Sequence, residues 1–416
     1  MRLTSVLRRM FSSLATRNFR IYLIGQVISN TGTWMQSIAM SWLVIRVTGS
    51  GVDLGLVSAA SFLPVLIFGT FAGVVVDRFP RRTILLITQS LFLLQALGFF
   101  VLTYSGSIKL WMIFALSLFF GAVNTVDPTA RQSFVEQLAG RDRLQNAVSL
   151  NSVTFNASRA VGPAIAGILI LTVGLSYAFL FNAISFIAVI VALFALRKSE
   201  MYPYQPQVRS KGQVREGLAY VREHSILAVT LIGIFLVGTL AYNFNVTLPL
   251  LAKYTFHGNA GTLSLLTSCF GVGAIAGGLW TALAADAKLA RLAKLAAVFA
   301  LAMLGLTISP NVWLASGALL LMGAFSLAFI AQANSLLQLN SEPALRGRVM
   351  ALYSVGFLGS TPIGSPIIGW VAQTYGVRWS LLLGVLSIAA TAWLFHLWAV
   401  RKRVATLGVV EATTIS

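Results

Sequence analysis

The chain has 416 residues, of which 57% are hydrophobic and only 10% are charged. A soluble domain carries about 25% charged residues, so a chain this apolar must face lipid over most of its surface. The net charge of +19 would suggest nucleic acid in a soluble protein, but the distribution of the basic residues indicates membrane orientation instead.

Twelve hydrophobic runs follow one another, each long enough to cross a hydrocarbon core of about 30 Å as a helix. They cover residues 19–45, 52–76, 83–105, 110–127, 146–172, 176–196, 225–250, 261–285, 293–309, 312–339, 348–373 and 379–400. The runs are unbroken and do not alternate in polarity, which excludes a β-barrel. We therefore expect an all-α membrane protein with twelve transmembrane helices and both termini on one side.

The basic residues indicate which side that is. With the N-terminus inside, 25 of the 30 Lys and Arg residues fall in inner segments, four fall in outer segments, and Arg159 lies within a span. Basic residues concentrate in the cytoplasmic segments of membrane proteins. The sequence therefore predicts a multi-pass protein of the cytoplasmic (inner) membrane, with both termini cytoplasmic.

The longest polar stretch divides the spans six and six. The expected parts are an N-terminal six-helix bundle (1–196), a cytoplasmic linker (197–224), a C-terminal six-helix bundle (225–400) and a cytoplasmic tail (401–416). A shift of 202 residues superimposes glycines of the two halves, pairing Gly162 with Gly364 and Gly167 with Gly369. This register implies two parallel bundles related by an axis along the membrane normal.

The turn between the second and third spans carries GVVVDRFPRR, residues 73–82. Gly73 permits close helix approach, and Asp77 can face the positive N-terminal end of another helix. The basic residues that hold this turn in the cytoplasm are Arg78, Arg81 and Arg82. The segment resembles the Gly-x-x-x-Asp-Arg-x-x-Arg-Arg/Lys signature of the major facilitator superfamily, whose fold is two parallel six-helix bundles.

That resemblance implies roles for the motif residues. Asp77 would face the start of span eleven, near Arg348 and Val349, and lock the two halves in the outward-facing state. Arg78 would pair with Asp127 at the cytoplasmic end of span four.

Segments over most of the chain resemble the exporter branch that contains enterobactin-type siderophore and macrolide/multidrug efflux proteins. They are residues 18–50, 127–138, 150–167 and 345–357.

Arg159 lies near the middle of span five. A charge at that depth costs at least about 2.5–3.5 kcal/mol unless it faces protein or water, so Arg159 should point into the bundle interior. Asn156 shares its helix face and could help to satisfy it. The element Gly162-Pro163-x-x-Ala166-Gly167 follows and partly matches one typical of drug–proton antiporters. Arg159 is then either a helix-bridging group bonded to carbonyls or a group for substrate binding or proton coupling.

Other polar residues within the spans form a candidate lining for a central pathway. Gln26, Asn30 and Thr33 share one face of the first span. The remaining members are Asn124 in span four, Asn243 in span seven and Asn334 in span ten. The family resemblance places these four spans around the pathway, although each residue alone could be a helix-packing contact. No Asp or Glu is expected deep in any span, so the cavity should suit neutral, zwitterionic or anionic compounds.

Enzyme function finds no support in the sequence. The three histidines lack metal-ligand spacing, and no phosphate loop is present, so we expect no catalytic residue, metal, cofactor or nucleic-acid partner.

The favoured function is a monomeric, proton-coupled exporter in membrane lipid. It would move a medium-sized organic compound, such as a siderophore, antibiotic or drug, by alternating access. The alternatives are a facilitator-type importer of a small metabolite and a lipid flippase or non-transporting membrane scaffold.

Overall fold

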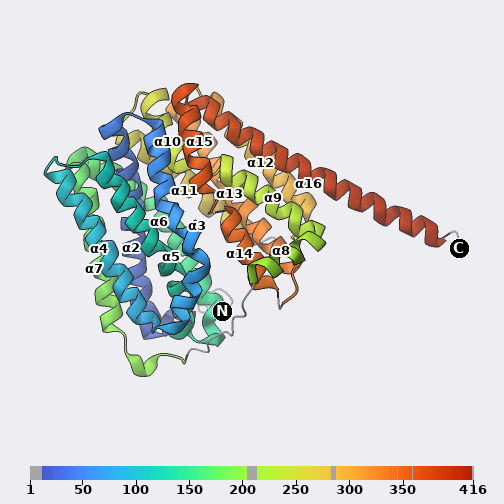
Figure 1. Cartoon of the computed structure of the whole chain (residues 1–416), viewed down its shortest axis with the longest axis horizontal. Coiled ribbons are helices and arrows are strands. Elements are labelled where there is room, and N and C mark those ends of the chain that lie inside the picture. The colour runs from blue at the N-terminus through green and yellow to red at the C-terminus, as the bar shows by residue number, and fades with distance from the viewer. Residues whose placement is uncertain (1–11, 204–212, 283–286, 344, 358, 415–416) are drawn as a thin grey trace, which may run out of the picture.

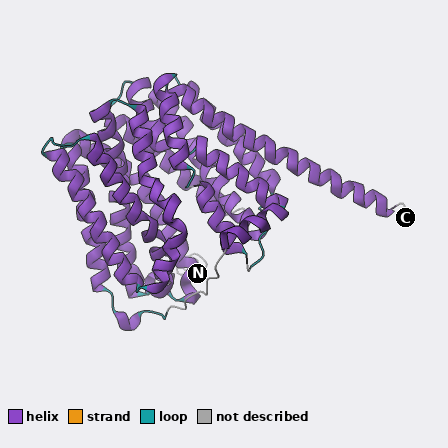
Figure 2. Ribbon diagram, in the orientation of Figure 1, coloured by secondary structure: helices purple, strands orange, loops and turns teal. Residues whose placement is uncertain are grey.

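The computed structural model describes residues 12–203, 213–282, 287–343, 345–357 and 359–414. All regular secondary structure in these ranges is helical (Figure 2). Long apolar segments fold this way in lipid because a helix satisfies its own backbone hydrogen bonds where no water is available.

The first half of the chain forms one bundle of long helices (Figure 1). These are α2 (Arg17–Thr48), α3 (Gly51–Arg78), α4 (Arg81–Tyr104), α5 (Leu110–Ala139), α6 (Leu144–Thr172) and α7 (Leu175–Ala195). Short helical turns accompany them at η1 (Ser12–Ala15), η2 (Arg141–Arg143) and η3 (Lys198–Glu200). The short helix α8 (Gln213–Glu223) follows within the predicted linker.

The second half forms a matching bundle. Its elements are α9 (Ser225–Leu240), α10 (Phe244–Leu250), η4 (Leu251–Thr255), α11 (Ala260–Ala282), α12 (Leu289–Ile308), α13 (Val312–Leu339), α14 (Arg346–Phe357), α15 (Thr361–Thr374) and α16 (Val377–Thr414). The seventh predicted span is broken into α9, α10 and η4, and the eleventh into α14 and α15.

The twelve predicted runs correspond to these helices. Eleven of the spans in the described residues are long and apolar enough to cross a membrane. The twelfth is α2, a 32-residue helix whose many Gln, Asn, Ser and Thr residues lower its hydropathy. Two boundaries differ from expectation, because α5 continues twelve residues past Asp127 and α16 continues through the predicted tail to Thr414. The twelve-helix all-α fold is therefore confirmed.

The most extensive contacts between the bundles are made by two pairs of helices, α3 with α15 and α6 with α11. A Cβ on Gly55 would lie 2.4 Å from the carbonyl oxygen of Ser365, and one on Gly167 would lie 2.6 Å from Cβ of Ser264. No side chain fits at these crossings, so glycine is required for the helices to approach this closely.

The two ends of the molecule differ. We call the end with the α3–α4 and α5–α6 turns the basic end, because Arg78, Arg81, Arg82, Arg141 and Arg143 lie there. We call the opposite end, which carries the α2–α3 and α15–α16 turns, the far end. The glycine crossings lie toward the far end, and the ribbons of the two bundles diverge toward the basic end (Figure 1).

Hydrogen bonds close the far end between the bundles. Gln373 Oε1 accepts from Ser50 Oγ at 2.9 Å and from the backbone N–H of Val52 at 3.0 Å. Tyr254 Oη donates to the carbonyl of Gly49 at 2.5 Å.

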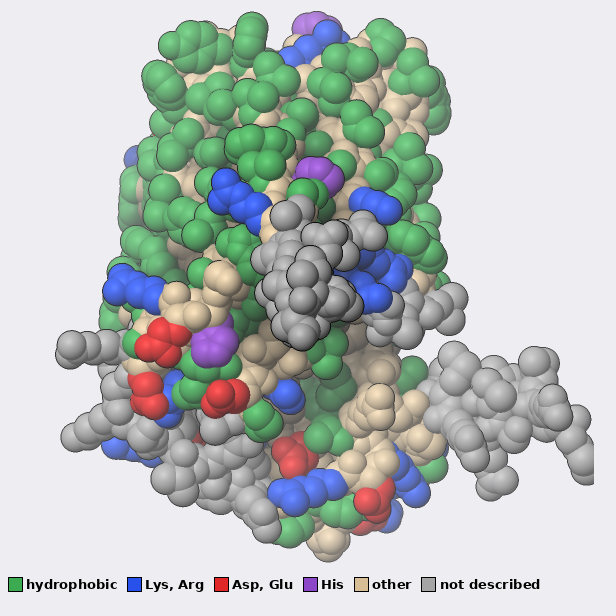
Figure 3. Space-filling view, turned by 90° about the vertical axis from the view of Figure 1, so that its right-hand side faces the viewer, with side chains coloured by type: hydrophobic (Ala, Val, Ile, Leu, Met, Phe, Trp, Pro, Cys, Tyr) green, Lys and Arg blue, Asp and Glu red, His purple; other side chains and the backbone are tan. Residues whose placement is uncertain are grey.

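One face of the surface is mostly hydrophobic in its upper part, and the acidic side chains visible on it lie in its lower half (Figure 3). Such a band is what a lipid-facing surface requires.

Candidate functional site

A cavity lies between the two bundles and has two lobes. The amide lobe, of about 240 Å³, is bordered by α2, α3, α4 and α5 and includes the amides of Asn30, Gln36 and Asn124. The aromatic lobe, of about 260 Å³, lies between α2, α3 and α6 on one side and the C-terminal bundle on the other. The two lobes share a set of lining residues, so they adjoin each other. The shared residues are Trp34, Ser41, Ser58, Phe62, Phe155 and Asn245.

Arg159 lines the aromatic lobe, as the sequence predicted that it would face the interior. Its guanidinium carbon lies 4.7 Å from the ring centre of Phe270 and 5.4 Å from that of Trp34. Cation–π contacts of this kind stabilise a cation that has lost part of its water. Arg159 makes no hydrogen bond or ion pair with any residue that the structure describes, so its N–H donors remain available to a bound molecule.

The amide lobe is neutral and rich in hydrogen-bonding groups. Asn30, Thr33 and Asn124 line it, as the sequence predicted for a central pathway. Gln36 also borders this lobe, and it donates to Gln95 Oε1 at 2.9 Å and accepts from Asn182 Nδ2 at 2.8 Å. This buried amide chain fixes α2, α4 and α7 against one another.

The Gly162-Pro163 element is a packing element in this structure. A Cβ on Gly162 would lie 2.6 Å from Cβ of Trp34, so glycine there lets α6 pack closely against α2. Pro163 and Ala166 are buried. Gly167 contacts Ser264 of α11, at a crossing between the bundles. The element therefore holds α6 against both of its partner helices.

Two of the predicted site residues take other positions, and a third lines the cavity. Asn156 was expected to help to satisfy Arg159, but its Nδ2 donates to the Ser152 carbonyl of its own helix at 2.9 Å. Asn334 accepts from Gln338 Nε2 at 2.5 Å and does not line either lobe. Asn243 does line the aromatic lobe, and it is buried there with its Oδ1 accepting from Ser365 Oγ at 2.8 Å.

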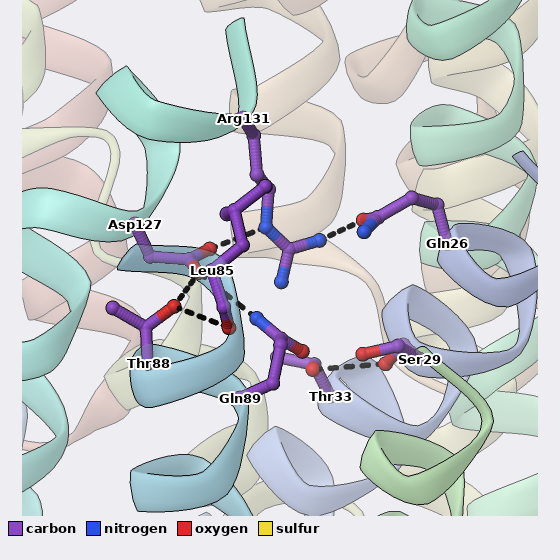
Figure 4. A network of polar contacts seen from close by, with 8 residues as sticks. All are labelled: Gln26, Ser29, Thr33, Leu85, Thr88, Gln89, Asp127 and Arg131. Atoms are coloured by element: carbon purple, nitrogen blue, oxygen red, sulfur yellow. Dashed lines mark hydrogen bonds and ion pairs between the residues drawn. The ribbon is translucent and has the colours of Figure 1, made fainter. Parts of the chain in front are cut away.

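Gln26 does not line the cavity but joins a buried ionic network beside it (Figure 4). Asp127 on α5 pairs with Arg131, one turn later on the same helix, and Arg131 also donates to Gln26 Oε1. Asp127 Oδ1 accepts from Thr88 Oγ1 at 2.6 Å and from Gln89 Nε2 at 2.9 Å, both on α4. Asp127 is only 3% exposed.

This network corrects two expectations. The sequence predicted no acid deep within a span, yet Asp127 is buried inside α5, because that helix continues well past the end of its apolar run. Asp127 was also expected to pair with Arg78, but its cationic partner is Arg131. The Arg78 side chain is exposed and forms no ion pair with a described residue.

The rest of the 73–82 segment ties the basic end of the N-terminal bundle together. Asp77 lies 3.4 Å from the Arg81 guanidinium, and Gly73 and Arg81 are buried. Arg82 Nε donates to the Leu193 carbonyl at the end of α7 at 2.9 Å. The interaction of Asp77 with the start of span eleven in the outward-facing state stays a prediction.

Arg348, the expected neighbour of Asp77, has a partner in the linker instead. Its guanidinium pairs with Glu216 of α8, and Cβ on Gly217 would lie 3.0 Å from Arg348 Cβ. The backbone N–H of Glu342, just before α14, donates to Tyr220 Oη of α8 at 3.1 Å. The linker helix α8 therefore packs on α14 and holds its first turn.

Two six-helix bundles around a central cavity that is closed at one end define a membrane carrier. Residues 9–409 match the family described as "Transmembrane secretion effector". The chain belongs to this family of the major facilitator superfamily, and it is a transporter of small molecules rather than an enzyme.

Characterised relatives cover most of the chain. The staphyloferrin A transporter of Staphylococcus aureus is 26% identical over 370 residues, which is 86% of this chain and 91% of that protein. The multidrug efflux pump Tap of Mycolicibacterium fortuitum is 27% identical over 390 residues, covering 88% and 94%. The macrolide efflux protein A of Streptococcus pyogenes is 24% identical over 380 residues, covering 88% and 92%. The first is named for transport of staphyloferrin A, and the other two are named for efflux.

Solved structures confirm the fold. A bacterial homologue of the iron transporter ferroportin in an inward-facing state superimposes with a TM-score of 0.72 at 13% identity, covering 92% of this chain and 98% of that one. The D-xylose–proton symporter superimposes with a TM-score of 0.70 at 16% identity, covering 92% and 97%.

Proposed function

We propose that this transporter exports a medium-sized organic solute with an acidic group and that Arg159 binds that group. The observation that carries the proposal is the Arg159 guanidinium, which faces the aromatic lobe with aromatic neighbours and no hydrogen-bond acceptor among the described residues. A cation in such a setting gains most from a carboxylate or another anion, because charge-assisted hydrogen bonds are about twice as strong as neutral ones.

The two lobes suit a solute with two chemically different parts. The ring contacts of Trp34 and Phe155, whose centres lie 5.9 Å apart, provide an apolar wall next to Arg159. The adjoining amide lobe offers neutral donors and acceptors such as Asn30 and Asn124 for hydroxyl, ester or amide groups. Relatives named for a siderophore, macrolides and multiple drugs are consistent with a solute of this size.

The direction and the driving force belong to the same proposal. Placing the basic end in the cytoplasm follows the concentration of basic residues there, and both termini are then cytoplasmic. In that orientation the far-end contacts close the outer side, and the conformation is inward-facing. The two bundles would rock about the cavity, and an inward proton gradient would drive export by a monomer.

Export can be tested in cells that lack and then regain the gene. Cells with the transporter should secrete more staphyloferrin A than cells without it, and a protonophore should abolish the difference. Accumulation that rises with the transporter would favour an importer. A gradient-independent difference would favour facilitated diffusion, and no difference for any solute would contradict the export proposal.

A further inference from the structure

The Asp127–Arg131 pair is surrounded by unused hydrogen-bonding capacity. Tyr22 Oη, Gln26 Nε2, Ser29 Oγ and Gln89 Oε1 have no hydrogen-bond partner among the residues that the structure describes. Each of these side chains is at most 2% exposed. Buried polar atoms in folded proteins are nearly always partnered by protein groups or by water, so these four atoms mark a polar site beside the ion pair that can hold water.

The pair also adjoins the central cavity. Asn30 and Thr33 follow Gln26 at helical spacing on α2, and Asn124 lies three residues before Asp127 on α5. All three line the amide lobe. Figure 4 shows Thr33 and Ser29 on α2 next to the side chains of the network. The network therefore lies one turn from the cavity, toward the basic end.

The groups that face the pair define its electrostatics. On α2, the titratable group that faces the pair is Tyr22. Its ring packs edge-on against Phe134 of α5, with 5.5 Å between the ring centres. α4 faces the pair with neutral Thr88 and Gln89. Asp77 of α3 and Arg81 of α4, at the basic end, interact with each other. Arg131 is thus the cation bonded to Asp127, and losing the ionised carboxylate would leave Arg131 without its counter-charge.

We propose that Asp127 is the carboxylate that carries the coupling proton. The inference rests on the proposed proton-coupled export and names the site of coupling. In the outward-facing state a proton from outside adds to a carboxylate oxygen of Asp127 and gives the neutral acid. In the inward-facing state the O–H bond breaks, the proton leaves to cytoplasmic water along the unpartnered hydroxyls of Tyr22 and Ser29, and the carboxylate pairs with Arg131 as observed.

The sign of the pH effect follows from this pair. The bond to Arg131 stabilises ionised Asp127 in the present conformation, so high pH favours this conformation and acid disfavours it. One linked proton changes the ratio of the two states by at most about tenfold per pH unit. Acid should therefore bring the two bundles together at the basic end.

The test measures this shift without any solute. Spin labels on Phe79→Cys and Leu339→Cys, both exposed positions at the basic end, report the separation of the bundles in purified full-length protein with Cys269→Ser in lipid nanodiscs. Between pH 8 and pH 5.5 the distance distribution should move to shorter values. Asp127→Asn should make it independent of pH, whereas Asp53→Asn, at the far-end start of α3, should respond as the parent does.

Asp127→Asn leaves Arg131 as an uncompensated buried charge and could fail to fold. The double variant Asp127→Asn with Arg131→Gln removes both charges, and it should also be insensitive to pH. A parent without a pH response, or a double variant that responds like the parent, would overturn the inference. A pH response that depends on Asp127 in a protein that exports none of the tested solutes would support the proton site and count against the proposed function alone.

Discussion

The guanidinium of Arg159, on α6 of the N-terminal bundle, lies over the ring of Phe270, on α11 of the C-terminal bundle, with 4.7 Å between the guanidinium carbon and the ring centre. The contact crosses the interface that must rearrange when the cavity opens to the other side. A solute bound at Arg159 would therefore touch both bundles, and its binding would be linked to their relative position.

Replacement of Arg159 tests the proposed solute contact. Arg159→Ala removes the charge-assisted hydrogen bonds, which contribute about 1.5–3 kcal/mol, so solute affinity should fall by roughly 10- to 150-fold. Arg159→Lys keeps the charge but loses the planar fork, and it should retain part of the affinity. Binding to purified protein and efflux in cells are the measurements. Arg46→Ala, at the end of α2, is the matched control. Unchanged affinity in Arg159→Ala would remove this residue from the solute site.

The Gly55–Ser365 crossing should be required for closure of the far end. Gly55→Ala places a methyl group 2.4 Å from the Ser365 carbonyl oxygen, so the two helices must separate. Export should stop, and a cysteine placed at Ser58 in the cavity should become reactive to a membrane-impermeant thiol reagent added outside. Gly69→Ala on the same helix meets only Val65, at 3.9 Å, and should behave as the parent. Normal export by Gly55→Ala would show that this crossing does not govern closure.

The Glu216–Arg348 pair should hold α14 in its present position. Glu216→Gln removes the charge that binds Arg348 and leaves Arg348 available to Asp77, so the state closed at the basic end should become more populated. The pair is partly exposed, so the effect should be about 1 kcal/mol or less, up to a fivefold change in the ratio of states. Spin-label distances measure it, and Glu223→Gln, exposed on the same helix, is the control. An increase that persists when Asp77→Asn is added would rule out the exchange of partners.

The Gln36–Asn182 contact should contribute to stability rather than transport. Asn182→Ala leaves Gln36 Oε1 without its donor in a fully buried site, at a cost of about 1–3 kcal/mol. The melting temperature of the purified protein should fall by several degrees. Asn156→Ala, which loses a bond within its own helix, should melt close to the parent. Equal melting temperatures for the two variants would contradict this role.

The sequence predicted the fold well because lipid imposes a strong pattern on it. Each span must be a long apolar helix, and no other element satisfies the backbone inside a bilayer. The same physics placed Arg159 correctly, since an arginine in mid-span has to face protein or a cavity. The amides of Asn30 and Asn124 followed from helical spacing and the family resemblance.

The ionic network was missed for a physical reason. Asp127 and Arg131 are spaced four apart, which is the spacing of an ion pair on one helix face. Hydropathy ends the fourth span at these charges, although the helix continues to Ala139 with both of them packed against α2 and α4. Because the segment DPTAR continues the helix, its Asp and Arg lie one turn apart on the same face and form the pair. The partners Thr88 and Gln89 depend on the packing of α4, which composition does not reveal.

Helix position predicted that Asn156 would help to satisfy Arg159 and that Asn334 would line the pathway. Side chains of this length can bond within their own helix instead. The choice between a carbonyl one turn away and the cavity depends on side-chain rotamers. Sequence periodicity resolves the face of a helix and not the direction of a single amide.

Alternating access requires that one cavity opens in turn at the two ends of the molecule. Paired spin labels can follow both ends in the same protein with Cys269→Ser, at Phe79 and Leu339 for the basic end and at Tyr104 and Trp313 for the far end. As conditions shift the population, the distance at one end should lengthen while the distance at the other shortens. Distances that change together, or that stay fixed at both ends during active export, would contradict the account.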